Sequence, residues 1–122
     1  MPLHSLALFQ SLVREGDWDY LNTSRPEQTK DKLGWGDEHV ATMLCGLTNG
    51  DFQKTVPDCK VHHLPGQELI DADQYEIHWD DGAGTRRPRP GAGTISLSLK
   101  IAIATDQHGN FAGLVTLHTS GY

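Results

Sequence analysis

Three arginines in the last third of the chain lie close enough together to bind phosphate groups. They are Arg86, Arg87 and Arg89, out of ten lysines and arginines in all. A guanidinium group matches the oxygens of a phosphate in geometry. Pro88 and Pro90 exclude a central strand here, so the segment should be an exposed arm or edge. We therefore expect the arm to contact phosphate; the alternative is a solvated loop whose arginines pair with Asp80 and Asp81.

Cutting RNA without a metal is one reaction that such residues support. It needs a group that takes the proton of the 2′-hydroxyl, a group that protonates the leaving oxygen, and cations that stabilise the charge on phosphorus. Lysine, arginine and histidine suit these tasks. Spacing alone does not single out a catalytic lysine, because a surface lysine such as Lys54 is by default a solubilising charge.

The histidines and cysteines do not form a recognisable metal site. His62 and His63 are adjacent and would point in opposite directions in an extended segment, and no H-E-x-x-H spacing accompanies the seven histidines. Cys45 and Cys59 form no C-x-x-C pair, so two reduced thiols are expected. With no glycine-rich phosphate loop, nucleophile elbow or paired catalytic carboxylates in the sequence, we predict no metal and no cofactor.

The overall charge argues against binding of nucleic acid by the whole surface. The net charge is -6 and the isoelectric point is near 5.5, so any RNA-binding role needs a local basic patch. The 122 residues suffice for one domain, residues 1–122, with a real core. No apolar run predicts a membrane span or a convincing signal peptide. We expect a cytoplasmic protein.

The stretch from Asp37 to Thr55 predicts a central helix that breaks and restarts. Four apolar residues follow helical spacing: Val40, Met43, Leu44 and Leu47. Asp37 should cap the helix. The capping-box pattern from Thr48 to Asp51 should open a further turn that carries Phe52 into the core and Lys54 to the helix end. Val56-Pro57 would then stop the helix.

Two further helices and a short strand are expected before this stretch. Ser5 should cap a helix that Gly16 ends and that buries Leu6, Phe9, Leu12 and Val13. Asp17 to Leu21 alternates as a short edge strand would. Ser24-Arg25-Pro26-Glu27 forms a capping box, so a second helix should run to Leu33 and stop at Gly34.

The rest of the chain predicts a long loop followed by strands. Residues 56–73 have no clear periodicity and should form a loop. Strands are expected at Gln74–Trp79, at Thr94–Ala104 and at Phe111–Thr119. The whole is predicted to be an α+β domain, with the N-terminal helices on one face of an antiparallel sheet that ends in a C-terminal β-hairpin.

The hairpin between the last two strands predicts which side chains share a face. If Gln107-His108-Gly109 is a three-residue loop with Gly109 left-handed, the apolar and polar sides of both strands agree. The opposed pairs would then be Leu99 with Leu117, Ile101 with Val115, Lys100 with Thr116 and Ser98 with His118. We therefore expect Ser98, Lys100 and His118 on one exposed sheet face, with Lys54 approaching it.

Several short motifs give the chain a resemblance to a known family. They are G-L-T-N-G-D-F-Q-K-T from Gly46, the pattern from Leu6 to Gly16, Leu33 to Trp35, Trp79-Asp80-Asp81, Arg87-Pro88-Arg89, Leu99-Lys100-Ile101 and the terminal L-V-T-L-H. In this order they resemble the MqsR family of toxins, RelE-like ribonucleases of bacterial toxin-antitoxin pairs. The resemblance implies a RelE-like fold and covers nearly the whole chain.

The resemblance also implies a set of site residues. Lys54 stands at the position of the lysine that family members use for metal-independent cleavage. Asp80, Ser98 and His118 stand where the family has glutamine, tyrosine and lysine, and complete the expected catalytic group. Lys100 joins Arg86, Arg87 and Arg89 as expected RNA-binding residues.

The expected function is therefore that of an mRNA interferase. The chain would cleave single-stranded mRNA, would be neutralised by a cognate antitoxin protein, and would bind neither membrane nor, alone, DNA. The alternative is a binding module of the same fold that has weak or no cleavage and acts through protein contacts. The acidic charge and the three changed positions favour the alternative; Lys54, Lys100 and the arginine arm favour the enzyme.

Overall fold

A computed structural model describes residues 2–22, 24–64 and 66–119, with the backbone alone for residues 24–27. The side chains of the predicted capping box at Ser24 therefore lie outside the described residues. The elements in chain order are α1 (Leu6–Arg14), β1 (Trp18–Tyr20), α2 (Ser24–Leu33), α3 (Asp37–Cys45), the 3₁₀ turn η1 (Asn49–Asp51), β2 (Phe52–Lys60), β3 (Leu69–Asp80), β4 (Thr85–Arg87), β5 (Thr94–Asp106) and β6 (Gly109–Thr119).

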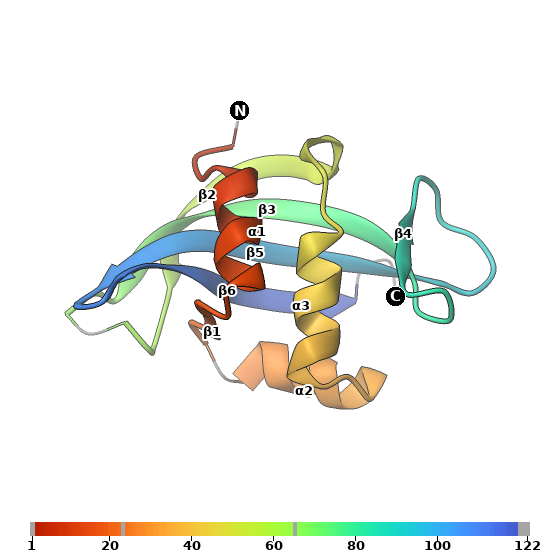
Figure 1. Ribbon diagram of the computed structural model, residues 1–122, viewed down its shortest axis with the longest axis horizontal. Helices are drawn as coiled ribbons and strands as arrows, with labels where there is room; N and C mark the ends of the chain where they lie inside the picture. Colours follow the sequence, from red (N-terminus) through yellow and green to blue (C-terminus); the bar gives the residue numbers. More distant parts are fainter. Residues whose placement is uncertain (1, 23, 65, 120–122) are drawn as a thin grey trace.

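The strands form one mixed six-stranded sheet, and the fold is α+β as predicted. The strand order is β1-β6-β5-β3-β2. β2 pairs with the first part of β3, and the short strand β4 pairs with the last residues of β3 on the same side. β2 and β4 therefore lie in line along one edge of the sheet (Figure 1). The expected sheet was wholly antiparallel, but the short edge strand β1 pairs with β6 in parallel, because α1 returns the chain to this side of the sheet in the direction of β6.

Helices α1 and α3 cross the same face of the sheet, and α2 lies at its β6 edge (Figure 1). The predicted apolar stripes face inward. They bury the main core, which consists mainly of Leu6, Phe9, Leu12, Val13, Val40, Met43, Leu44, Tyr75, Ile77, Trp79, Leu97, Leu99, Ile101, Leu114 and Leu117. Ser5 caps α1 by accepting a hydrogen bond from the backbone N–H of Leu8 at 3.2 Å, as expected. No helix in the described part of the chain is long and apolar enough to cross a membrane.

The start of α3 differs from the prediction. Gly36, not Asp37, is the N-cap residue. The Asp37 carboxylate instead accepts hydrogen bonds from the hydroxyl of Tyr20 at 2.8 Å and from the Lys30 ammonium at 2.9 Å. These two donors, Lys30 first, lower the pKa of Asp37. Asp37 thus ties β1 and α2 to the start of α3.

The chain after α3 was predicted correctly for one turn and wrongly beyond it. Thr48 and Asp51 form the expected capping box around η1. Phe52 then opens strand β2, so Lys54 lies in a strand and not at a helix end. Residues 56–73 are also mostly strand, because β2 pairs with β3 as far as Lys60. Pro57 is tolerated because it sits at a bulge in an edge strand, where no ladder hydrogen bond is lost.

The β5–β6 hairpin confirms most of the predicted register and corrects its loop. Leu99 faces Leu117, Lys100 faces Thr116 and Ser98 faces His118, as expected. The loop itself has two residues, Gln107 and His108, because Asp106 pairs with Gly109. The shorter loop shifts the register by one residue near the turn, and a bulge between the pairs of Lys100 and Ile101 restores the predicted register beyond it. Ile101 therefore faces Leu114 and not Val115.

The residue displaced by that bulge, Val115, joins a second and smaller core on the other face of the sheet. This core consists of Leu21, Val61, Leu64, Ala72, Ala102, Ala104 and Val115. Leu21 of this core packs directly on β6 at Gly113, below the 61–68 connection. A Cβ at position 113 would lie 2.5 Å from the side chain of Leu21, so glycine leaves the space that this core needs. The second core therefore covers only one end of this face.

A buried carboxylate fastens the N-terminal segment to the sheet. Asp73 is fully buried and accepts hydrogen bonds from the backbone N–H of Leu3 at 2.9 Å, the backbone N–H of His4 at 2.7 Å and the hydroxyl of Thr55 at 2.7 Å. The His4 ring accepts a hydrogen bond from the backbone N–H of Ile103 at 3.1 Å, and its other nitrogen lies 2.8 Å from the carbonyl oxygen of Asp71. This arrangement continues the pairing between β3 and β5 beyond its last residue pair.

Tyr75 gives a prediction about alkaline unfolding. Its ring is fully buried, and its hydroxyl makes no hydrogen bond with any described residue. Burial, and then the carboxylates of Asp73 and Asp51, raise the pKa of Tyr75 to about 12. Since the unfolded phenol ionises near pH 10, this contribution to stability is present below about pH 10 and is lost as the pH rises toward 12. We expect Tyr75→Phe to unfold at a higher pH, as followed by circular dichroism; equal alkaline midpoints would contradict this.

Candidate functional site

The face of the sheet opposite α1 and α3 has a polar surface. It is formed by side chains that alternate with the core residues of β3, β5 and β6 and by one residue of β2. We call this surface the polar face; its residues are Lys54, Gln74, Glu76, His78, Ser96, Ser98, Lys100, Thr116 and His118. Directly opposed residues of antiparallel strands point to the same side, so the pairing places these side chains together.

The first row of the polar face contains two lysines. Lys54 opposes Gln74, Gln74 opposes Lys100, and Lys100 opposes Thr116. Lys54 and Lys100 are thus two strands apart, which corresponds to about 10 Å between their Cβ atoms. Lys54 is exposed and Lys100 is half-buried. The two ammonium groups can therefore contact neighbouring phosphates or the same one.

The second row places His118 beside Ser98, as the hairpin predicts. Glu76 opposes Ser98, and Ser98 opposes His118. Ser98 is not exposed as predicted: it is only 5% accessible, because its short side chain lies between longer neighbours. Its hydroxyl accepts a hydrogen bond from the Gln74 amide at 3.2 Å. Ser98 therefore forms the floor of the site, and His118 and Glu76 form its two sides.

The third row lies toward the arginine arm. His78 opposes Ser96, and its Nδ1 lies 2.9 Å from the Ser96 hydroxyl oxygen. On the other side of β3, Arg87 opposes His78. Arg87 therefore occupies, in β4, the position that Lys54 occupies in β2. Along the edge formed by β2 and β4, the polar face thus has a basic residue at each end, Lys54 and Arg87.

Asp80 does not join the lysines. It is six residues further along β3 than Gln74, or about 20 Å in an extended strand. Its carboxylate pairs with Arg87 at 2.9 Å and accepts the backbone N–H of Ala83 at 3.1 Å. The hydrogen bond from Ala83, followed by that from Arg87, lowers the pKa of Asp80. Its local partners are those of a turn that holds β4 against β3.

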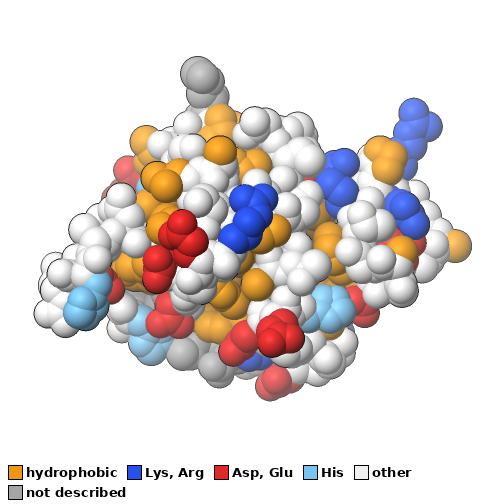
Figure 2. Space-filling view, viewed as in Figure 1, with side chains coloured by type: hydrophobic (Ala, Val, Ile, Leu, Met, Phe, Trp, Pro, Cys, Tyr) orange, Lys and Arg blue, Asp and Glu red, His pale blue; other side chains and the backbone are white. Residues whose placement is uncertain are grey.

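The three arginines of the arm do not act as one group. The Arg86 guanidinium lies 2.6 Å from the carboxylate of Asp51, on the helix side of the sheet. Asp51 completes the capping box of η1 by accepting the backbone N–H of Thr48, so the aspartate of the D-F-Q-K motif has a structural role. Arg87 pairs with Asp80, which matches part of the alternative interpretation, and Arg89 is exposed. Figure 2 shows basic side chains at the β4 end of the molecule, and a further basic group over the middle of the same face.

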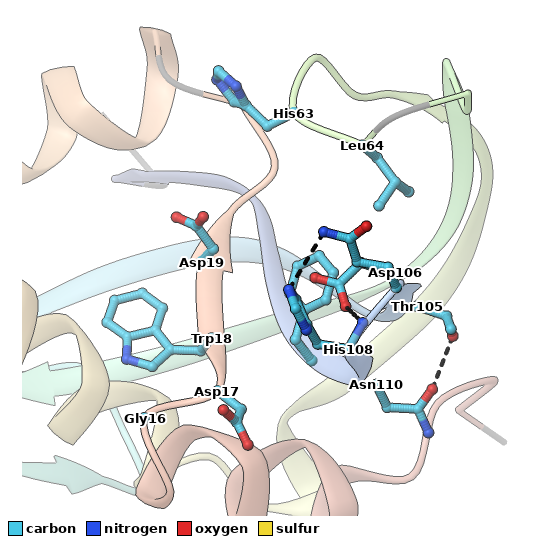
Figure 3. A pocket seen from close by; sticks show the side chains of 12 residues that line it. Gly16, Asp17, Trp18, Asp19, His63, Leu64, Thr105, Asp106, His108 and Asn110 are labelled. Atoms are coloured by element: carbon cyan, nitrogen blue, oxygen red, sulfur yellow. Dashed lines mark hydrogen bonds between the residues drawn. The ribbon is translucent and has the colours of Figure 1, made fainter.

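Two hollows adjoin the β6 side of the molecule and differ in charge. A groove of about 470 Å³ beside the polar face is lined by Lys60, Lys100, His62 and Asp58, among others. A pocket of about 750 Å³ at the hairpin tip lies between β1 and the loop before β6 (Figure 3). Its carboxylates are Asp17, Asp19 and Asp106. With two lysines against one carboxylate, the groove suits a polyanion better than the pocket does, where three carboxylates outnumber the side chains of His63 and His108.

Sequence reasoning did not identify Glu76 and His78 as members of the site. The alternation of Gln74, Glu76 and His78 with Tyr75, Ile77 and Trp79 is visible in the sequence. It indicates which residues share a face, but only the pairing of β3 with β5 shows that this face is the one with Lys100 and His118. That pairing joins segments separated by a turn and an arm, so local pattern does not determine it.

Comparison with known proteins adds no relative to this description. Neither the family models nor the curated proteins nor the solved structures contain a match to the chain. No relative therefore assigns a role to the lysines, the histidines or the glutamate of the polar face.

Proposed function

We propose that the chain is a metal-independent endoribonuclease that cleaves single-stranded RNA on its polar face. The observation that supports this most is the first row of that face, where Lys54 and Lys100 lie on the same side of the sheet as His118. This brings together two cations for phosphate and a group for proton transfer, the combination that metal-free cleavage needs. The motifs shared with MqsR-like toxins point to the same reaction.

The proposed reaction is an internal transesterification. The 2′-hydroxyl gives its proton to a base while its oxygen forms a bond to phosphorus, and the bond from phosphorus to the 5′ oxygen breaks with its electron pair. The products are a 2′,3′-cyclic phosphate and a 5′-hydroxyl. His118 gives a proton to the leaving 5′ oxygen, and the ammonium group of Lys100, with Lys54 beside it, stabilises the negative charge that develops on the phosphoryl oxygens.

An RNA assay in a chelator tests the proposal. We expect the purified chain to cut a labelled single-stranded RNA in excess EDTA, to leave a 2′,3′-cyclic phosphate, and to spare an all-deoxy oligonucleotide of the same sequence, because DNA lacks the attacking hydroxyl. Mass spectrometry of the fragments identifies the new ends. Cleavage that stops in EDTA, or that also consumes the deoxy oligonucleotide, would contradict the mechanism, and an intact RNA would contradict the function.

The biological setting belongs to the same proposal. An mRNA interferase of the RelE-like type would be cytoplasmic and would be held inactive by a cognate antitoxin protein. Expressing the gene in a bacterium with and without its neighbouring open reading frame, and mapping mRNA ends, tests this. Growth arrest that the neighbour relieves is the expected result.

One observation favours the alternative of a binding module. Arg86 and Arg87 both pair with carboxylates, at Asp51 and Asp80, which reduces the positive charge that the arm offers to RNA. A protein that binds RNA or a partner on the polar face without cutting would show binding in the same assay and no new RNA ends.

A further inference from the structure

Glu76 lies opposite His118 across the floor of the polar face. The two residues flank Ser98 in one row, with Glu76 on β3 and His118 on β6. Two strand spacings separate their Cβ atoms by about 10 Å. The residue between them, Ser98, is small and buried. The two longer side chains, Glu76 and His118, therefore stand higher above the sheet than the serine that separates them. A phosphate above Ser98 would have a carboxylate on one side and an imidazole on the other.

The charges around Glu76 offset its repulsion of phosphate. On its own strand it stands between Gln74 and His78. Across the neighbouring strands, the groups nearest to it on the same face are Lys54 of β2, Arg87 of β4, and Ser96, Ser98 and Lys100 of β5. The diagonal neighbours of Glu76 thus include Lys54, Lys100 and Arg87, of which Arg87 is already paired with Asp80. The other carboxylate on this side of β3, Asp80, is paired with Arg87, so Glu76 is the carboxylate beside the two lysines. A carboxylate next to cations is the arrangement expected where an anionic substrate meets a proton acceptor.

We infer that Glu76 is the general base of the proposed reaction and His118 its proton-donating partner; this inference rests on the proposed function. The Glu76 carboxylate takes the proton of the 2′-hydroxyl while that oxygen bonds to phosphorus. The bond to the 5′ oxygen breaks with its electron pair, and His118 gives this oxygen a proton. The two residues exchange protonation states, and a later proton transfer through water restores them.

Kinetics of Glu76→Gln test the assignment. We expect kcat to fall about 100-fold with KM changed less than about 2-fold. The decline of rate at low pH should disappear, because the amide, unlike a carboxylate, does not take up a proton there. Glu38→Gln is the matched control, since Glu38 is an exposed glutamate of α3 on the helix side. Urea unfolding of both variants should match the parent, which separates catalysis from folding.

A substrate with sulfur in place of the 5′ oxygen separates the two roles. A thiolate leaves without protonation, so this substrate should restore the rate of His118→Ala but not that of Glu76→Gln. The inference is overturned if Glu76→Gln cleaves within about 3-fold of the parent, if the sulfur substrate restores it, or if His78→Gln removes the low-pH decline instead. In those cases the parent still cuts RNA in EDTA; a parent that does not cut overturns the proposed function itself.

Discussion

Replacing Lys100 with alanine should lower the rate of RNA cleavage by about 10²–10³-fold, the effect of removing one group that stabilises transition-state charge. Lys100 is diagonal to His118 on the neighbouring strand, or about 7–8 Å between Cβ atoms. Lys54 is three strands from His118, or about 16 Å when the offset of one row is included. A phosphate within reach of His118 is therefore within reach of Lys100 first.

Lys54→Ala should accordingly cost less, about 10-fold, through weaker binding of a flanking phosphate. The resemblance to MqsR-like toxins assigns the larger role to Lys54, so the two variants decide between family position and sheet position. Lys32→Ala is the control, because Lys32 is an exposed lysine of α2. Single-turnover cleavage in EDTA measures all three. A larger loss for Lys54→Ala than for Lys100→Ala would show that the scissile phosphate lies at the β2 edge.

Replacing Asp73 with asparagine should reduce the free energy of unfolding by about 3 kcal/mol, the upper part of the range for hydrogen bonds to a buried charged group. The carboxylate accepts three hydrogen bonds, two on Oδ1 from Leu3 and Thr55 and one on Oδ2 from His4. An amide has only one accepting oxygen, so its NH₂ group would face at least one N–H or O–H donor. The N-terminal segment before α1 would lose its attachment.

Asp71→Asn is the matched control for that measurement. Asp71 also accepts one backbone N–H, from Asp58 at 3.0 Å, but it is exposed. Its replacement should cost less than about 1 kcal/mol. Urea unfolding followed by circular dichroism compares the two variants. Equal losses for Asp71→Asn and Asp73→Asn would mean that burial of the Asp73 carboxylate does not matter.

Elements that are determined by local pattern could be predicted from the sequence. The helix from Leu6 has a strict apolar stripe with Ser5 and Gly16 at its ends, and β5 alternates with little exception, so both are found where expected. The same local signals, together with the turn at Gly109, correctly predict that Lys100 and His118 share one face of the sheet.

Features that depend on distant contacts could not be predicted. The capping box at Thr48 is real, but it is followed by a strand because Phe52 packs on Tyr75, a residue more than twenty positions away. The role of Asp73 depends on a segment about seventy residues distant. The position of Glu76 opposite Ser98 follows only from the register between β3 and β5, which the sequence does not show. In each case the sequence shows the residue type and the tertiary contact determines what it does.

The bulge in β2 also bears on how the molecule behaves at high concentration. β2 is an edge strand, and such an edge can recruit a strand from another molecule. Pro57 has no N–H to offer, and Asp58 has a φ of 57°, which turns the backbone out of the extended path. The N–H of Asp58 is already used by Asp71. A neighbouring molecule therefore finds no continuous row of donors and acceptors along this edge, which opposes growth of the sheet into aggregates.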